Sequence, residues 1–295
     1  MTARNPALGG NHARGVACLL AAIGLLGLME VGVKTLTESL SVGQILWARF
    51  FFHLVAAWPI FMMLGVRSIA RTERPLLQCM RSVLQLLATL GVFLALAHAP
   101  LAEAISIHYL SPLIVTALSL PLLGERVSLP RWLAVVAGFA GVVVILRPGF
   151  EGAPWGAAFA LISAVSYALF QITTRMLGIT DRPWTTMFYT PLVGAAAASM
   201  VVPFVWTAPT PGQWLILVSL GLFAGVAHYM LIKAFQHAQA SSLQPYNYVH
   251  IVWASILGIV FFGAVPEAWT LLGAALIVGG GLFVFYRDAR GTRPR

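Results

Sequence analysis

The sequence predicts an all-α integral membrane protein with ten transmembrane helices, arranged as two inverted five-helix repeats. Of its 295 residues, 59% are hydrophobic and only 9% are charged, and the mean hydropathy is +0.87. A soluble domain of this length needs far more charge to cover its surface. The second half of the chain also repeats the first, and each half contains five apolar segments.

Ten segments are long and apolar enough to cross a bilayer, which requires about 20 residues. Short connections rich in proline, glycine or charge separate them. The fifth is the shortest, but its sequence WLAVVAGFAGVVVIL is apolar throughout. The expected spans are 15–36, 42–64, 76–98, 101–123, 131–147, 155–177, 185–206, 213–235, 241–263 and 268–286.

The basic residues predict which way the chain crosses the membrane. Lysine and arginine concentrate in cytoplasmic loops, and an N-terminus in the cytoplasm puts nearly all of them on that side. Among the opposite loops only the one after the fifth span is basic, through Arg147. Both termini are therefore expected in the cytoplasm. The cytoplasmic set is Arg4, Arg14, Arg67, Arg71, Arg74, Arg126, Arg131, Arg182, Lys233, Arg287, Arg290, Arg293 and Arg295.

The internal repeat is visible without gaps. Residues 98–127 lie over residues 237–266 at an offset of 139, and a second match has an offset of 141. An odd number of helices per repeat inverts the second copy in the membrane, an architecture typical of secondary transporters with a central site. We expect one unit over 1–147 and another over 148–295. The matched pairs include His98/His237, Ala99/Ala238, Tyr109/Tyr248, Leu118/Leu257, Gly124/Gly263, Gly141/Gly280, Gly15/Gly156, Glu30/Gln171 and Lys34/Arg175.

Several functional classes are disfavoured. The net charge of +9 comes from loop residues, so nucleic acid is not an expected partner. Two cysteines, Cys18 and Cys79, form neither a disulfide framework nor a metal motif. Nucleotide-binding, HExxH and GxSxG motifs are missing, which argues against an ATP-driven pump and an enzyme. We expect no catalytic residue, no metal and no cofactor. A scaffold or sensor, which would need an attached soluble domain, and a channel are also disfavoured.

Ionisable residues within spans identify the first candidates, since a charge at the bilayer centre costs about 3 kcal/mol or more. Glu30 and Lys34 lie one turn apart on the first span, and Gln171 keeps a polar group at the position equivalent to Glu30. Glu30 can face a central cavity and take a proton or a substrate amine. Alternatively, the two residues form an ion pair whose lysine reaches the interface.

The second span adds Arg49 and His53, also one turn apart. Histidine can carry a proton near physiological pH, or it can be a neutral hydrogen-bonding residue. A guanidinium does not neutralise by deprotonation, so Arg49 needs an anion, a carbonyl array or water. Glu30 is one partner that the sequence allows for Arg49.

The fourth and ninth spans contain the best candidates for the binding site. His108 and Tyr109 align with Asn247 and Tyr248, so each half carries a hydrogen-bonding residue followed by a tyrosine. Prolines in both spans remove backbone donors, which bends a helix or frees carbonyls for a ligand. The further residues of this group are Pro112, Pro245, His250 and Trp253. The fifth and tenth spans lack interior polar groups and are expected at the periphery, with 279–281 (three glycines) as a packing face.

The chain resembles the EamA-type family of the drug/metabolite transporter superfamily. The resemblance rests on LSLPLLGERVSLPRW with AGFAGVVVILRPG, on FFGAVPEAWTLLGAALIVGGGLFVFYR, on Lys34 or Arg175 closing the first helix of each repeat, and on Arg49. It extends from about Gly15 to Arg287. One departure is that Glu125, after the repeat-ending glycine, is Ala264 in the second copy.

The resemblance implies a bacterial inner-membrane carrier that works by alternating access on a small-molecule substrate. The leading expectation is export of amino-acid-like metabolites, with proton coupling through Glu30 or a cavity histidine. The alternative is uptake of a heterocyclic metabolite such as riboflavin or S-adenosylmethionine. The lipid bilayer is the expected environment, and the sequence leaves a homodimer open.

Overall fold

A computed structural model describes residues 8–123, 129–146, 154–178, 180–238 and 240–291. Seven residues named above lie outside this part: Arg4, Gly124, Glu125, Arg126, Arg147, Arg293 and Arg295. The described chain is helical, with these elements: α1 (Leu8–Leu36), α2 (Val42–Leu64), α3 (Val66–Ile69), α4 (Pro75–His98), α5 (Leu101–His108), α6 (Ser111–Leu123), α7 (Leu129–Leu146), α8 (Pro154–Leu177), α9 (Pro183–Val201), η1 (Val202–Phe204), α10 (Pro211–His237), α11 (Ala240–Asn247), α12 (Val249–Phe262) and α13 (Ala268–Gly291).

Ten candidate membrane spans occur in the described chain, in close agreement with the expected segments. The fourth consists of α5 and α6, and the ninth of α11 and α12. These two spans break at Tyr109 and Tyr248, the repeat-related tyrosines. Pro112 and Pro245 lie three residues from their breaks, and each removes one backbone donor. The chain tightens there into three-residue turns, with Leu110 N donating to Ile107 O at 3.0 Å and Tyr248 N to Pro245 O at 3.3 Å.

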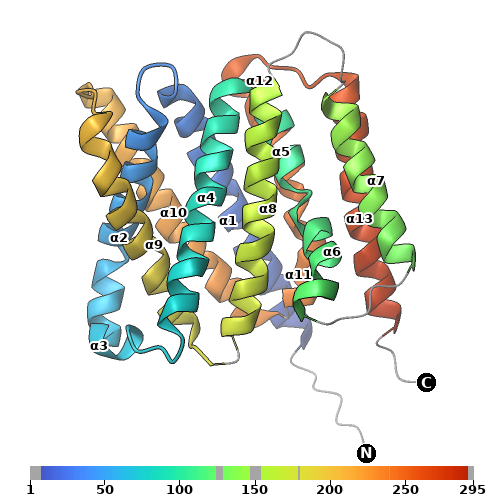
Figure 1. The fold of residues 1–295 in the computed structure, drawn as a ribbon, viewed down its shortest axis with the longest axis horizontal. Coiled ribbons are helices and arrows are strands. Elements are labelled where there is room, and N and C mark those ends of the chain that lie inside the picture. The colour runs from blue at the N-terminus through green and yellow to red at the C-terminus, as the bar shows by residue number, and fades with distance from the viewer. Residues whose placement is uncertain (1–7, 124–128, 147–153, 179, 239, 292–295) are drawn as a thin grey trace, which may run out of the picture.

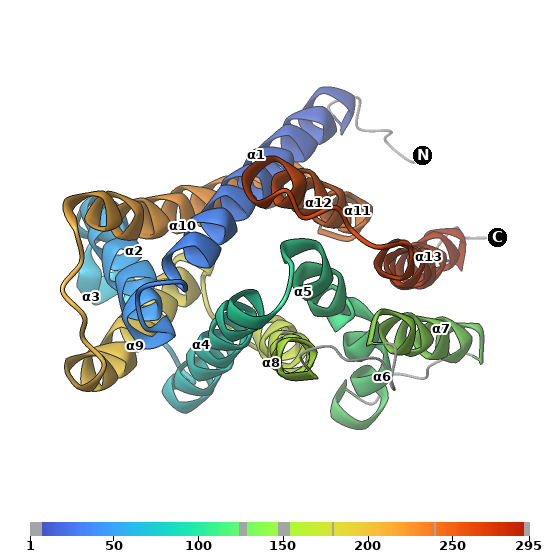
Figure 2. The same ribbon diagram turned by 90° about the horizontal axis from the view of Figure 1, so that it is seen from above.

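The two halves pack as pseudo-symmetric helix pairs. Helix α1 lies along α10, and its counterpart α8 lies along α4 (Figure 2). A Cβ on Gly15 of α1 would approach Ala238 Cβ to 2.7 Å, and a Cβ on Gly156 of α8 would approach Ala99 Cβ to 2.7 Å. Gly15 and Gly156 are repeat equivalents, as are Ala99 and Ala238. The same close contact therefore occurs twice, each time between the halves.

Helices α7 and α13 form a third pair, which lies at one edge of the molecule (Figure 2). Their backbones nearly touch, because a Cβ on Gly141 would come within 2.6 Å of Gly273 O and one on Gly280 within 2.9 Å of Ala134 O. Such approach is how helices associate in lipid. Of the three expected packing glycines, Gly280 and Gly281 make close contacts, whereas Gly279 has open space beside it.

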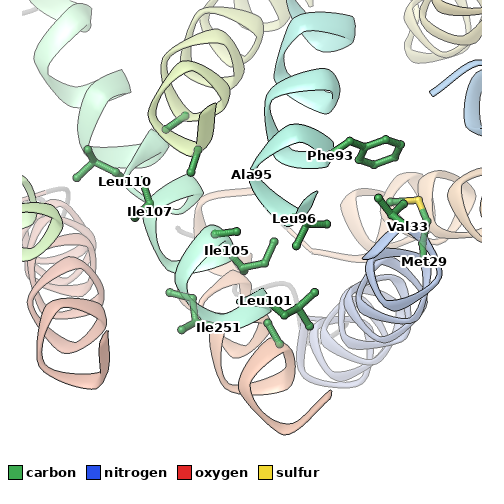
Figure 3. Close-up of a cluster of buried hydrophobic side chains, with 14 of the residues drawn as sticks. Met29, Val33, Phe93, Ala95, Leu96, Leu101, Ile105, Ile107, Leu110 and Ile251 are labelled. Carbon is green, nitrogen blue, oxygen red and sulfur yellow. The ribbon is translucent and has the colours of Figure 1, made fainter. Parts of the chain in front are cut away.

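The apolar core lies where α1, α4, α5 and α12 meet. Figure 3 shows Met29 and Val33 of α1 facing Leu96 of α4, with Leu101 of α5 and Ile251 of α12 beyond them. Leu96 and Leu101 are almost completely buried. This core surrounds the polar groups described next and keeps them away from lipid.

Helix α1 begins and helix α13 ends on the same face of the molecule, the lower one in Figure 1. We call this the terminal face. Near it, the Asp181 carboxylate accepts hydrogen bonds from Thr72 and from Gln78, both at 2.6 Å. At the opposite face, the Gln44 side chain donates to Thr207 O and accepts from Thr207 N, both at 2.9 Å. Each face thus carries a polar contact between the two halves. A recess of about 720 Å³, lined in part by Arg71, Glu73 and Asp181, opens beside the Asp181 contact.

Candidate functional site

Glu30, His250 and Tyr109 form a buried hydrogen-bonded triad. Glu30 lies on α1, Tyr109 at the break between α5 and α6, and His250 in the first turn of α12. His250 Nε2 is 3.1 Å from Glu30 Oε2, and His250 Nδ1 is 2.9 Å from the Tyr109 hydroxyl. Glu30 is 6% exposed and His250 is 4% exposed. Since Glu30 and Tyr109 belong to the first half and His250 to the second, the triad connects the two repeats.

The hydrogen positions in this triad follow from donor and acceptor counting. An ionised Glu30 only accepts, so Nε2 of His250 carries hydrogen, and Nδ1 then accepts from the Tyr109 hydroxyl. When the pair takes up a proton, both ring nitrogens become donors. Tyr109 must then accept from Nδ1 and turn its own O–H elsewhere. One proton therefore reverses the direction of one hydrogen bond.

Lys34 does not form the ion pair with Glu30 that the sequence allows. It binds backbone carbonyls instead. Lys34 Nζ donates to Leu96 O at 2.9 Å and to Ala99 O at 2.8 Å. These carbonyls end α4, where a helix leaves acceptors without partners and where a cation is favourable. Lys34 thus joins α1 to the end of α4.

His108 belongs to a second buried hydrogen-bond network, which lies beside Tyr109. Ser163 on α8 donates its only hydroxyl hydrogen to Ala88 O at 2.6 Å, while His108 Nδ1 is 2.9 Å from the same Oγ. His108 must therefore donate from Nδ1, which leaves Nε2 as the acceptor when the ring is neutral. The Tyr167 ring lies 5.0 Å from the His108 ring. Sequence reasoning missed Ser163, because its repeat equivalent is Ala22 and the duplication gives no signal.

Arg49 and His53 are buried in α2, and Glu30 is not the partner of Arg49. Arg49 is 2% exposed and His53 is fully buried. The His53 ring lies 5.1 Å from the His228 ring of α10. Gly221 and Gly225 of α10 lie against this part of α2, so small residues make room for His53.

The remaining candidates lie around the second break. The Tyr248 ring is 6.1 Å from the Tyr109 ring, so the two repeat-related tyrosines meet across the halves. Trp253 donates from Nε1 to Gly24 O at 3.3 Å and covers Gly27 of α1. Asn247 ends α11, and Gln171 is half-buried on α8. The structure therefore brings Glu30, His108, Tyr109, Tyr248 and His250 together, and it leaves Lys34 and Trp253 in helix-packing roles.

Comparison with known proteins agrees with this architecture. The sequence profile of the EamA-like transporter family matches residues 13–147 and 154–286, one stretch in each half. The chain belongs to the EamA-like transporter family. This membership makes it a transporter rather than an enzyme, and a multi-pass bacterial membrane protein. A crystal structure of a protein with 22% identity superimposes with a TM-score of 0.67, covering 95% of this chain and 99% of that one.

The similar EamA proteins differ in what they carry. The riboflavin transporter of Rhizobium johnstonii is 32% identical, covering 90% of this chain and 89% of the relative. The S-adenosylmethionine uptake transporter of Rickettsia conorii is 27% identical, covering 88% of each chain. The pseudopaline exporter of Pseudomonas aeruginosa is also 27% identical, covering 90% of this chain and 93% of the relative.

Proposed function

We propose that this EamA protein is a proton-coupled carrier in the bacterial inner membrane that takes up a ring-bearing metabolite by alternating access, with both termini in the cytoplasm. The observation that carries the proposal is the Glu30–His250–Tyr109 triad. A buried carboxylate facing a histidine can hold an added proton, and this pair bridges the two halves. Protonation of the Glu30–His250 pair therefore changes a contact between the two repeats, which move relative to each other in alternating access.

The coupling follows from the hydrogen-bond reversal. With Glu30 ionised, Tyr109 donates to His250, and its hydroxyl hydrogen is occupied. With the pair protonated, that hydrogen is free to bind a solute or a new partner. A solute that prefers one state of Tyr109 is therefore linked to the proton, because a ligand shifts a conformational equilibrium only by its differential affinity.

Aromatic rings beside the triad support a ring-bearing solute. Tyr109, Tyr248, His108 and Tyr167 lie in a series with ring centroids 5.0 to 6.1 Å apart, a spacing at which planar groups interact favourably. The riboflavin transporter and the S-adenosylmethionine uptake transporter among the relatives also favour uptake of a ring-bearing solute.

Export of amino-acid-like metabolites is the second candidate. The pseudopaline exporter among the relatives supports it. The proton relay is compatible with either direction, since the gradient drives uptake by symport and export by antiport. Direction is therefore decided by the sign of the flux under an imposed gradient.

The first experiment is a flux screen in proteoliposomes with an imposed pH gradient. The solutes are labelled riboflavin, S-adenosylmethionine and a panel of amino acids. We expect gradient-driven accumulation of one solute class and loss of the gradient dependence in Glu30→Gln, because the amide cannot take up the proton. Glu38→Gln is the matched control, since Glu38 is an exposed acid just beyond α1.

Each result has a definite meaning. Coupling at the triad is supported if the Glu30→Gln variant accumulates no more solute with a pH gradient than without one. Equal pH dependence in Glu30→Gln and in the unmodified chain would remove Glu30 from the coupling step. Flux of no solute in the panel would reject the proposed substrate classes.

A further inference from the structure

Arg49 is a buried cation without a polar partner for two of its nitrogens. Nε and Nη1 are inaccessible to solvent and make no hydrogen bond within the described part of the chain. The contact that the structure provides is the face of Phe50, 4.2 Å from Cζ. Guanidinium retains its charge at any physiological pH, and a buried charge without a partner is strongly unfavourable. An unpaired group of this kind calls for an explanation.

Arg81 of α4 shows how the same fold satisfies a buried arginine. Its Nε donates to Thr174 Oγ1 and its Nη1 to Thr190 Oγ1, both at 2.7 Å. The Phe170 ring lies 4.4 Å from its Cζ. Arg81 thus has protein hydrogen-bond partners in addition to an aromatic face, whereas among the residues that the structure describes Arg49 has the aromatic face alone. The difference indicates that the partner of Arg49 comes from outside the chain.

Two histidines, His53 of α2 and His228 of α10, lie close to Arg49, and their rings are 5.1 Å apart. Both ring nitrogens of His53, one turn along α2, are buried without a hydrogen-bond partner. His228 Nδ1 lies 2.8 Å from Ala224 O and must donate to it, so its Nε2 is the nitrogen that remains. Arg49, His53 and His228 therefore form a cluster of potential donors, which we call the Arg49 cluster.

The buried carboxylate of Glu30 and the Asp181 carboxylate near the terminal face both have other partners. Glu30 binds His250, and Asp181 accepts hydrogen bonds from Thr72 and Gln78. The Arg49 cluster is thus a positive region whose charge no described carboxylate balances. An anion that enters with the transported molecule would balance it.

We propose that the Arg49 cluster binds a carboxylate of the transported solute, so that the substrate class is ring-bearing organic acids, such as amino acids with an aromatic or heterocyclic part. This inference rests on the proposed function and narrows it. A carboxylate matches the geometry of the guanidinium fork, and charge-assisted hydrogen bonds of this type are the strong ones. Free chloride or phosphate shares the same chemistry, and the test below separates these ions from the solute.

The position of the cluster suits a solute that bears both a carboxylate and a ring. The Phe170 ring lies 4.4 Å from Arg81 Cζ and 5.5 Å from the Tyr167 ring. The His108 ring lies 5.0 Å from the Tyr167 ring and 5.7 Å from the Tyr109 ring. A series of contacts therefore runs from Arg81 on α4 to the Glu30 triad, and α2, which carries Arg49, packs against α4. A molecule with a carboxylate at one end and a ring at the other is complementary to the Arg49 cluster and to these aromatic side chains.

The test compares solutes that differ only in the carboxylate, on the purified full chain in detergent and in proteoliposomes. S-adenosylmethionine is paired with its decarboxylated form, and L-tryptophan with tryptamine. Riboflavin serves as a ring without a carboxylate, and sodium chloride and sodium phosphate as simple anions. Thermal stabilisation reports binding, and flux reports transport. The chains are the unmodified protein, Arg49→Gln, Arg49→Lys and the control Arg67→Gln, which removes an exposed positive charge from α3.

In at least one pair, we expect the solute with the carboxylate to raise the unfolding temperature of the unmodified protein. The matched solute without the carboxylate should not raise it. Arg49→Gln should weaken that binding by about tenfold to a hundredfold, as loss of a charge-assisted hydrogen bond does. Arg49→Lys should restore part of it, and Arg67→Gln should have no effect. The comparison within pairs uses the unmodified chain, so it holds even where Arg49→Gln does not fold.

Four outcomes overturn the inference: equal binding of both members of each pair, riboflavin binding that Arg49→Gln leaves unchanged, stabilisation by chloride or phosphate that no solute displaces, and binding of no carboxylate in the panel. Failure of the proposed function is seen separately. In that case flux is absent for every solute, or it ignores both the pH gradient and Glu30→Gln.

Discussion

The Tyr109 hydroxyl is the part of the triad whose hydrogen-bond direction changes when Glu30 and His250 take up a proton. It lies 2.9 Å from His250 Nδ1 and accounts for one of the two hydrogen bonds of that ring. Removing the hydroxyl leaves a buried acceptor without a partner, which costs about 1–3 kcal/mol. The hydrogen bond between Glu30 and His250 stays in place.

We therefore predict that Tyr109→Phe uncouples transport from the proton without abolishing solute flux. The measurement is the dependence of flux on the imposed pH gradient, compared with the unmodified chain. Tyr286→Phe, at an exposed position of α13, is the control and should behave as the unmodified protein. Full gradient dependence in Tyr109→Phe would show that the hydroxyl takes no part in coupling.

The sequence marks individual residues of the triad as candidates, but it does not show which residues are hydrogen-bonded to each other. Glu30, Tyr109 and His250 are recognisable because polar groups inside apolar spans are costly and occur at repeat-related positions. Their pairing is not visible, since Glu30 and His250 are 220 residues apart. The helix packing that joins them depends on glycines and small side chains distributed over the whole chain. For the same reason the sequence alone allows either a cavity-facing Glu30 or an ion pair with Lys34, which lies one turn away on the same helix.

At the scale of elements, the broken ninth span depends on a glycine of another helix. Tyr248 lies at the break between α11 and α12, and a Cβ on Gly281 of α13 would collide with its ring and hydroxyl. The neighbouring Gly279 has open space instead. Replacement of these two glycines by alanine should therefore have different effects on stability.

We predict that Gly281→Ala displaces Tyr248 and lowers stability by about 1–3 kcal/mol, the usual cost of overpacking a filled core. Gly279→Ala should be neutral or slightly stabilising, since alanine favours the helix. Thermal unfolding in detergent measures both variants, and solute affinity shows whether the Tyr248 ring has moved. Equal unfolding temperatures for the two variants would contradict the contact between α13 and the break.

The spans themselves were predictable, and the reason is physical. A helix in lipid must satisfy its own backbone and be apolar for about 20 residues, so composition alone marks its limits. The breaks were only partly predictable. Pro112 and Pro245 indicated a disturbance, but the chain breaks at Tyr109 and Tyr248, where three-residue turns replace the regular ladder.

At the scale of the whole molecule, the two halves are tied at both faces. Asp181 joins them near the terminal face through Thr72 and Gln78. Gln44 joins them at the opposite face through Thr207. Alternating access requires one of these contacts to open while the other holds. The two contacts therefore have opposite effects on the equilibrium between the conformation open at the terminal face and the one open at the opposite face. Weakening one contact by about 1.4 kcal/mol changes the ratio of these two conformations about tenfold.

We predict that Asp181→Asn opens the terminal face and that Gln44→Leu opens the other. The first change weakens two charge-assisted hydrogen bonds, and the second removes both bonds to Thr207. Electron-spin distance measurements in nanodiscs test this with one label pair per face, at Ser68 and Arg182 and at Glu38 and Ala208, all exposed positions. The first pair should separate in Asp181→Asn and the second in Gln44→Leu.

The control is Glu73→Gln, because Glu73 is an exposed acid that lines the same recess as Asp181. It removes the same charge from the terminal face and should leave both distance distributions unchanged. If Glu73→Gln separated the first pair as much as Asp181→Asn, net charge in the recess rather than the hydrogen bonds of Asp181 would hold this face closed. If neither contact variant moved either pair, the two halves would be held by helix packing such as that of Gly15 and Gly156, and the polar contacts would have no part in gating.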